Sequence, residues 1–189
     1  MKTKIISASV VVGIMWLIFI ADYIIPGNFN NMGITPRTLK GLLGIVFAPF
    51  LHDGIYHIVS NTIPIFVLTL VLGIFYERIA LRVWVLSALI GGAMVWLLSF
   101  RDATHVGASG VIFSLIGFIM ASGIFRKSFK SIIIGIIIFF FYGGSLWGIL
   151  PTNPWISWEG HLFGLVAGIF LAYIFRKEET SFSTKEKFD

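Results

Sequence analysis

The stretch GASGVIFSLIGFIMASGIF, residues 107–125, has no charged side chain across its whole length. The hydrocarbon core of a bilayer is about 30 Å thick, and a helix needs about 20 apolar residues to cross it. Residues 107–125 are therefore predicted to form a transmembrane helix. Further apolar runs of similar length lie at 5–25, 57–76, 81–99, 131–150 and 159–175. Together these runs predict an all-α membrane protein, a bundle of six transmembrane helices.

The composition agrees with a membrane location. Of the 189 residues, 57% are hydrophobic and 12% are charged, whereas soluble domains carry about 25% charged residues. The net charge is +5, but the basic residues form short clusters between apolar runs, which predicts the lipid bilayer and not nucleic acid as the partner. Because the chain has no cysteine, disulfides, thiol nucleophiles and thiolate metal sites are excluded.

The chain is predicted to form one membrane domain, residues 1–175, followed by a short charged tail, 176–189, that is too polar to fold alone. The first run shares its basic start and apolar core with signal peptides. It is long for such a segment, and no cleavage pattern follows it, so we expect a transmembrane helix. Residues 39–51 are apolar but too short to cross a bilayer. They are expected to lie in the membrane interface as part of a membrane-associated first loop.

The distribution of Lys and Arg predicts the orientation, because cytoplasmic loops carry the excess. With the N-terminus inside, eleven of the fourteen basic residues fall on the cytoplasmic side, and Arg37, Lys40 and Arg101 fall outside. Both termini are therefore predicted to be cytoplasmic. The helices at 57–76, 107–125 and 159–175 then all begin at the outer surface.

Polar side chains gather at the outer ends of those three helices. His57, Asn61, Ser109 and His161 all lie within the first turns, within about 6 Å of one another in depth at 1.5 Å rise per residue. A single histidine near a helix end can equally bond a neighbouring carbonyl or reach the interface. Ionisable groups in membrane helices are costly, however, and four polar residues at one level indicate a functional site.

These residue types suit amide hydrolysis, which needs a nucleophile, a base and donors for the developing oxyanion. Ser109 is the candidate nucleophile and His161 the candidate base. Small residues on the two helices would let them approach closely. They are Gly107, Gly110, Gly117, Gly160, Gly164 and Gly168.

The remaining polar residues suggest how the charge would be stabilised. His57 and Asn61 are four residues apart and share a helical face, so they are candidate oxyanion donors together with the backbone N–H of Ser109. Glu159 lies two residues before His161 and points to a different face. We therefore expect a Ser-His dyad and no third, acidic member.

Three of these segments resemble the motifs of the rhomboid family of intramembrane serine proteases. Residues 107–110 match its G-x-S-G motif, and residues 160–168 match its His-x-x-Gly-x-x-x-Gly helix. Residues 57–61 look like its His-x-x-x-Asn motif, and His52 falls where the family often has a histidine. The motifs occur in family order, and the resemblance to the prokaryotic six-helix core covers nearly the whole chain.

The resemblance implies an endopeptidase in the bacterial cell membrane that cuts transmembrane segments of other proteins from a site open to the outer face, without a cofactor or metal. It assigns catalysis to Ser109 and His161, and oxyanion or substrate binding to Asn61 and His57. Phe113 stands where many members have Tyr, so the ring can stack on the base without a hydroxyl contact. The residues given a supporting role are Gly107, Gly110, Gly164, Gly168, Phe113 and His52.

Three alternatives stay open from the sequence. The first is a rhomboid-like scaffold that binds membrane segments without cutting them, although such proteins usually lack the Ser or the His. The second is a transporter that uses the polar layer to pass a solute. The third is a metal site built from His52, His57, His105 and His161, whose spacing matches no known zinc pattern. The sequence carries no signal for an oligomeric state.

Overall fold

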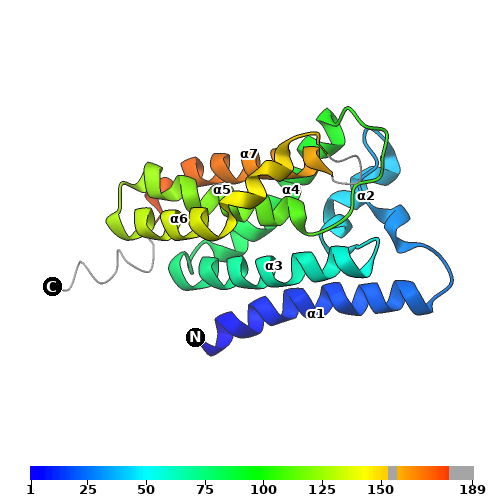
Figure 1. The fold of residues 1–189 in the computed structure, drawn as a ribbon, viewed down its shortest axis with the longest axis horizontal. Helices are drawn as coiled ribbons and strands as arrows, with labels where there is room; N and C mark the ends of the chain where they lie inside the picture. The colour runs from blue at the N-terminus through cyan, green and yellow to red at the C-terminus, as the bar shows by residue number, and fades with distance from the viewer. Residues whose placement is uncertain (153–156, 179–189) are drawn as a thin grey trace.

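The computed structural model describes residues 1–152 and 157–178 as a bundle of helices (Figure 1). Within these residues six helices are long and apolar enough to cross a membrane, which confirms the predicted fold class. Two of them continue into short 3-10 helices. The six are α1 (Lys2–Ile24), α3 (Ile55–Phe75), α4 (Ala80–Leu98), α5 (Ser109–Arg126), α6 (Phe129–Tyr142) with η3 (Gly143–Ile149), and α7 (Trp158–Ile174) with η4 (Phe175–Lys177).

The first loop carries the remaining helices: η1 (Phe29–Met32), α2 (Leu39–Phe47) and η2 (Ala48–Phe50). The Thr38 hydroxyl caps α2 by accepting a hydrogen bond from Gly41 N–H at 3.0 Å. The apolar side chains of Leu39, Leu43 and Val46 face outward, as expected for a helix that lies in the membrane interface. The predicted tail begins within η4, which ends at Lys177 and is followed by Glu178. Residues 179–189 of the tail lie outside the described residues.

The sequence explains where the helices near the site begin and end. Gly107 has φ +111°, a conformation that other residues rarely adopt, so α5 begins only at Ser109. The predicted helix at 131–150 divides into α6 and η3 at Gly143 and Gly144, because two consecutive glycines weaken an α-helix.

The helix α5 forms the centre of the bundle. In its apolar span 67% of the residues are buried, against 11% in α1, and it contacts α3, α4, α6 and α7. Figure 1 shows α5 next to α7 and α6. The polar start of α5 is therefore enclosed by other elements on several sides.

Glycines make the contact between α5 and α7 possible. A methyl group added at Gly164 would overlap the carbonyl oxygen of Gly110, and one added at Gly168 would overlap that of Ser114. Lipid tails are as apolar as leucine, so membrane helices associate through close van der Waals contact and not through the hydrophobic effect. The glycines thus allow close van der Waals packing of the two helices and a short distance between them.

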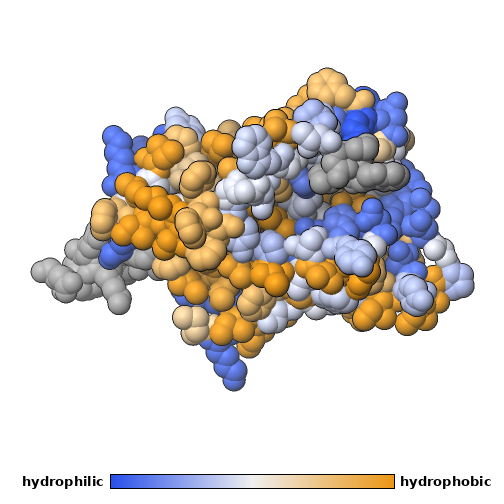
Figure 2. Space-filling view, in the orientation of Figure 1, coloured by the Kyte–Doolittle hydropathy of each residue, from blue (hydrophilic) through white to orange (hydrophobic). Residues whose placement is uncertain are grey.

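The outer surface agrees with a chain that spans a membrane. Figure 2 shows hydrophobic side chains over much of one face, with hydrophilic side chains gathered toward its two ends. The large exposed hydrophobic residues are most frequent on α1 and α6, and others lie on α2, α3, α4 and α7. In a bilayer this apolar surface contacts lipid and not water.

We predict that Gly168→Ala lowers the thermal unfolding midpoint of the protein in detergent, because the new methyl group overlaps the Ser114 carbonyl. Overpacking of this kind costs about 1–3 kcal/mol. Gly13→Ala on α1 is the matched control, since nothing lies within 4 Å of its added carbon. Equal midpoints for the two variants would contradict the proposed role of the glycine contact.

Candidate active site

The four polar residues at the outer helix ends line one cavity of about 900 Å³. Asn61 and His57 come from the first turns of α3, Ser109 is the first residue of α5, and His161 is the fourth residue of α7. Segments that are far apart in the sequence thus bring a hydroxyl, two imidazoles and an amide to the wall of one space. Ligand and substrate sites are typically concave spaces of about this size.

The ring of His161 is fixed by contacts on two sides. Its Nδ1 lies 2.9 Å from the carbonyl oxygen of Gly148 in η3, and since a carbonyl only accepts, Nδ1 carries the proton. Nε2 is then the nitrogen with the free lone pair. Phe113 stacks on the imidazole with ring centroids 4.1 Å apart and planes 6° apart. The orientation of the ring and its tautomer are therefore both determined before any substrate binds.

The turn that leads into Ser109 requires glycine. A side-chain carbon at Gly107 would lie 2.5 Å from Nε2 of His57, and the positive φ of Gly107 disfavours any other residue. The Gly107 N–H donates to the Ala48 carbonyl at 2.9 Å, which ties this turn to the first loop. Ser109 then begins α5, where the first backbone N–H groups have no partner within the helix.

Asn61 presents an unused donor next to this turn. Its side chain is 5% exposed, and its Nδ2 has no hydrogen-bond partner among the described residues. A carbon added at Gly107 would lie 3.5 Å from Nδ2. A buried donor without a partner costs about 1–3 kcal/mol, so such a donor beside a serine indicates a place where negative charge can be bound.

The structure gives Asp53 a contact that the sequence reasoning missed. Asp53 precedes α3, and its Oδ1 lies 2.6 Å from Nδ1 of His57, four residues later. The carboxylate orients the imidazole so that Nε2 faces Gly107. The spacing of four residues could have indicated this contact, because side chains four residues apart are neighbours in a helix. Asp53 lies before the start of α3, however, so the spacing alone did not predict the contact.

His52 is a buried neighbour of His57. Its ring packs edge-on against that of His57, with centroids 5.0 Å apart, and its side chain is 3% exposed. Burial, followed by the charge of His57, lowers the pKa of His52 to about 4. His52 is therefore neutral near pH 7 and supports the site through packing.

Glu159 does not contact His161 through a carboxylate hydrogen bond. Its two oxygens accept hydrogen bonds from the Ser99 hydroxyl at 2.9 Å and from the Phe100 N–H at 2.7 Å. Both partners lie at the end of α4, on a different side of α7. The Glu159 carboxylate therefore binds the end of α4 and not the ring of His161.

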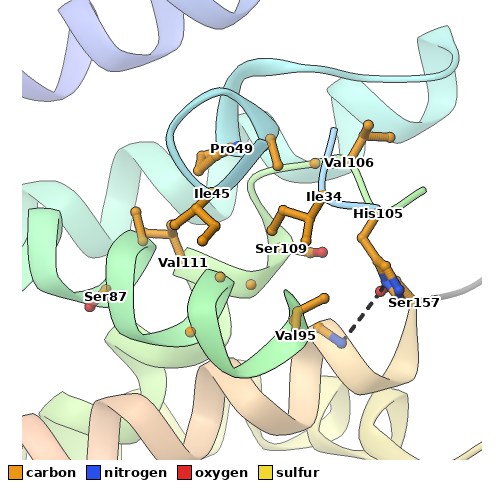
Figure 3. A pocket seen from close by; sticks show the side chains of 17 residues that line it. Ile34, Ile45, Pro49, Ser87, Val95, His105, Val106, Ser109, Val111 and Ser157 are labelled. Atoms are coloured by element: carbon orange, nitrogen blue, oxygen red, sulfur yellow. Dashed lines mark hydrogen bonds between the residues drawn. The ribbon is translucent and has the colours of Figure 1, made fainter. Parts of the chain in front are cut away.

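A second, smaller pocket also has Ser109 in its wall (Figure 3). It has a volume of about 40 Å³, enough for about one water molecule. Figure 3 shows Ser109, His105 and Ser157 at its wall, together with apolar residues of α4 and the first loop. Ser109 thus lines both the large cavity and the small pocket, and so do His105 and Ser157.

The alternative of a metal site finds no support in the geometry. Within residues 1–152 and 157–178, no three His, Cys, Asp or Glu side chains converge to hold a metal ion. His105 instead forms hydrogen bonds with Ser99 and Ser157.

The sequence profile of the Rhomboid domain matches residues 40–178, which include all four polar residues of the cavity. The chain belongs to the rhomboid family. An uncharacterised protein of Mycobacterium tuberculosis is 34% identical over 178 residues, 89% of this chain and 73% of that protein. A protein provisionally named a rhomboid protease, from Bacillus subtilis, is 31% identical over 134 residues, 66% of this chain and 62% of that protein. RHOMBOID-like protein 6, mitochondrial, of Arabidopsis thaliana is 26% identical over 69% of this chain and 42% of that protein.

Membership in the family confirms the resemblance seen in the motifs. It also makes this rhomboid a multi-pass integral membrane protein, in agreement with its six apolar helices.

The burial of His52 predicts a loss of stability in acid. Its ordinary pKa is 6.5 and its pKa in the folded protein is about 4, so between these values the unfolded chain binds a proton that the folded protein does not. The free energy of unfolding therefore falls as the pH drops from about 6.5 toward 4, by about 3 kcal/mol in total.

The thermal midpoint measured from pH 7 to pH 4.5 checks this expectation. His52→Phe keeps an aromatic ring without the titrating group, and its midpoint should change less over this range than that of the unmodified protein. Some change of the midpoint with pH should remain in this variant, because His105 is also buried and its pKa is also lowered. Identical slopes would show that His52 does not take up the proton.

Proposed function

We propose that this rhomboid is an intramembrane serine endopeptidase that hydrolyses peptide bonds in or near the transmembrane segments of other membrane proteins. The observation that carries the proposal is the shared cavity, whose wall contains both Ser109 and an imidazole whose Nδ1 is already bound to the Gly148 carbonyl. The family of the chain and the provisional name of its Bacillus subtilis relative support the same chemistry.

In the first half of the reaction, Ser109 Oγ attacks the carbonyl carbon of the substrate while Nε2 of His161 accepts the hydroxyl proton. The new C–O bond forms as the carbonyl π electrons move to oxygen. His161 then gives its proton to the leaving amine as the C–N bond breaks, which leaves an ester on Ser109. In the second half, water attacks the ester carbonyl while Nε2 of His161 accepts a proton from it. The bond between the acyl carbon and Ser109 Oγ then breaks as His161 gives this proton to Oγ, which releases the acid product and restores the serine.

The oxyanion formed at each stage needs donors, and three lie around the turn at Gly107. They are the Ser109 backbone N–H, Asn61 Nδ2 and His57 Nε2. Asp53 binds Nδ1 of His57, so His57 donates from Nε2 when its ring is protonated at both nitrogens. Donors that already point at the position of the developing charge stabilise it without reorganising at the moment of reaction.

In a Ser-His-Asp triad the acid orients the histidine. In this site the Gly148 carbonyl and the ring of Phe113 would do so instead. The Gly148 carbonyl fixes the tautomer of His161, and Phe113 fixes the plane of the imidazole. A neutral carbonyl stabilises an imidazolium less than a carboxylate does, but it does not add a charge to the buried site.

Substrates are proposed to enter between α3 and α6. The cavity wall includes Ser60 and Pro64 on α3, and Tyr142, Gly144 and Ser145 at the junction of α6 and η3. Displacement of α6 would open this side of the cavity to lipid, where a transmembrane segment of the substrate lies. A disulfide engineered between α3 and α6 should therefore slow cleavage of membrane substrates, and unchanged cleavage would count against this route.

The proposed orientation places both ends of the described chain at the cytoplasmic face of a bacterial cell membrane. At this end Lys4 pairs with Glu77 at 2.8 Å, and Arg82 pairs with Glu178 at 3.5 Å. In Figure 1 the start of α1 and the end of α7 lie at the same end of the bundle. The cavity lies at the opposite end and would open to the outer face.

We expect the purified protein in liposomes to cleave a single-pass model substrate, and Ser109→Ala and His161→Ala to lower kcat at least about 1,000-fold, because loss of a dyad member removes nucleophilic catalysis. Product is measured by gel analysis of the substrate, and folding by the thermal midpoint. Cleavage by folded Ser109→Ala would show that the nucleophile is another residue. If the unmodified protein binds several substrates and cuts none, the chain is a scaffold.

Asn61→Ala is expected to lower kcat by about 100- to 1,000-fold with a small effect on KM, as for loss of an oxyanion donor. Because Nδ2 has no partner among the described residues, its removal breaks no hydrogen bond and should leave the thermal midpoint near that of the unmodified protein. Ser7→Ala on α1 is the control, since the Ser7 hydroxyl donates to the Thr3 carbonyl within its own helix and Ser7 does not line the cavity. Retained kcat in Asn61→Ala would exclude the amide from the oxyanion site.

A further inference from the structure

A second cluster of polar side chains lies beside the dyad without belonging to it. It consists of Ser99 at the end of α4, His105 in the loop before α5, and Ser157 and Glu159 at the start of α7. Glu159 is 0% exposed, and Ser99 and His105 are also buried. Such a set of buried polar groups is costly unless each has a partner.

The hydrogen bonds of the cluster form one connected path. The Ser99 hydroxyl donates to Glu159 Oε2 at 2.9 Å and lies 3.2 Å from Nε2 of His105. Nδ1 of His105 lies 2.6 Å from the Ser157 hydroxyl, which also accepts from the Gly160 N–H at 3.3 Å.

For a neutral His105, one arrangement of protons satisfies all these contacts. His105 donates from Nε2–H to Ser99, and the Ser157 hydroxyl donates to Nδ1. Burial lowers the pKa of His105, although the charge of Glu159 opposes this shift. The path then runs in one direction, from the N-cap of α7 through His105 and Ser99 to the carboxylate of Glu159.

The cluster joins the two chain segments that carry the dyad. Glu159 lies two residues before His161, and His105 lies four residues before Ser109. His105 also exchanges two backbone hydrogen bonds with Ile34, both 2.9 Å long, which attach the first loop at the same place. His105 and Ser157 line the large cavity and also the small pocket, in whose wall they are drawn in Figure 3.

We propose that Glu159 and His105 are positioning residues, whose hydrogen bonds fix the start of α7 against the segment that leads into Ser109 and so set the distance between His161 and the Ser109 hydroxyl. This proposal rests on the proposed function. The glycine contact between α5 and α7 fixes how far apart the helix axes lie. The cluster fixes the relative height of their first turns.

The chemistry of the cluster favours positioning over stability as its role. A buried carboxylate gains little net stability over an apolar residue of similar size, because its desolvation offsets its hydrogen bonds. It does discriminate between geometries, since a small shift leaves a buried charge without its donors. The first turn of α7 also favours a negative charge through the helix dipole. Misplacement of catalytic groups by about 1 Å can cost about 100-fold in rate.

The test compares Glu159→Gln with Glu77→Gln. Both remove one carboxylate charge, but Glu77 is an exposed partner of Lys4 at the other end of the bundle. For each protein the kcat and KM for a model substrate are measured, together with the rate at which an organophosphonate reagent labels Ser109 and the thermal midpoint. The labelling rate reports the nucleophile and base without a contribution from substrate docking.

We expect Glu159→Gln to lower kcat and the labelling rate in parallel, by about 10- to 100-fold, with KM within about twofold. Glu159→Asp, which restores the charge, should recover part of both rates, and Glu77→Gln should match the unmodified protein. If Glu159→Gln lowers only the thermal midpoint, and folded protein keeps its kcat and labelling rate, the proposal is overturned.

Ser99→Ala keeps the test decisive if Glu159→Gln does not fold, since it removes the hydroxyl between His105 and Glu159 and leaves the carboxylate bound to Phe100. It should lower the labelling rate in the same way, and an unchanged rate in folded Ser99→Ala would overturn the proposal. An unmodified protein that neither cuts substrate nor labels at Ser109 would overturn the proposed function itself. Activity in the unmodified protein, absent from Ser109→Ala and undiminished in Glu159→Gln, would overturn the positioning role alone.

Discussion

The close contact between α5 and α7 is the constraint on which the rest of the structure depends. Gly164 and Gly168 lie directly against backbone carbonyls of α5, which brings the helix that begins with Ser109 next to the helix that carries His161. Membrane helices gain no hydrophobic attraction from each other, so a contact without side chains is an effective way to hold two of them together. The same contact makes α5 the most enclosed helix of the bundle and leaves α1 at its edge.

The spanning helices could be predicted from the sequence, because they depend on the length and composition of its apolar runs. Six apolar runs gave six spanning helices, because the thickness of the bilayer sets their length. The start of α5 was predicted two residues early, at Gly107, since an apolar run does not reveal that a glycine has positive φ. The helix at 131–150 was predicted as continuous, because its hydrophobicity extends through Gly143 and Gly144 even though its α-helical geometry does not.

Residues of the candidate site that lie in helices could be predicted from the sequence, and those that lie in loops could not. Ser109, His161, His57 and Asn61 lie in helices whose direction fixes their depth, so the sequence could place them at one level. Partners located in loops could not be found in this way. Asp53, which binds His57, and Ser99 and His105, which contact each other near Glu159, meet only after the loops fold back on the bundle. No periodic pattern encodes such contacts.

The position of Gly148 links substrate entry to the state of the base. Gly148 belongs to η3, the continuation of α6, and its carbonyl is the partner of His161 Nδ1. If α6 and η3 move aside to admit a transmembrane segment, that partner moves with them, and the tautomer of the imidazole is no longer fixed. An open conformation would then load substrate but react slowly, and chemistry would proceed only after the segment returns. Proteins that enter the open site only briefly would then leave uncut, because the base is not aligned for catalysis while the entrance is open.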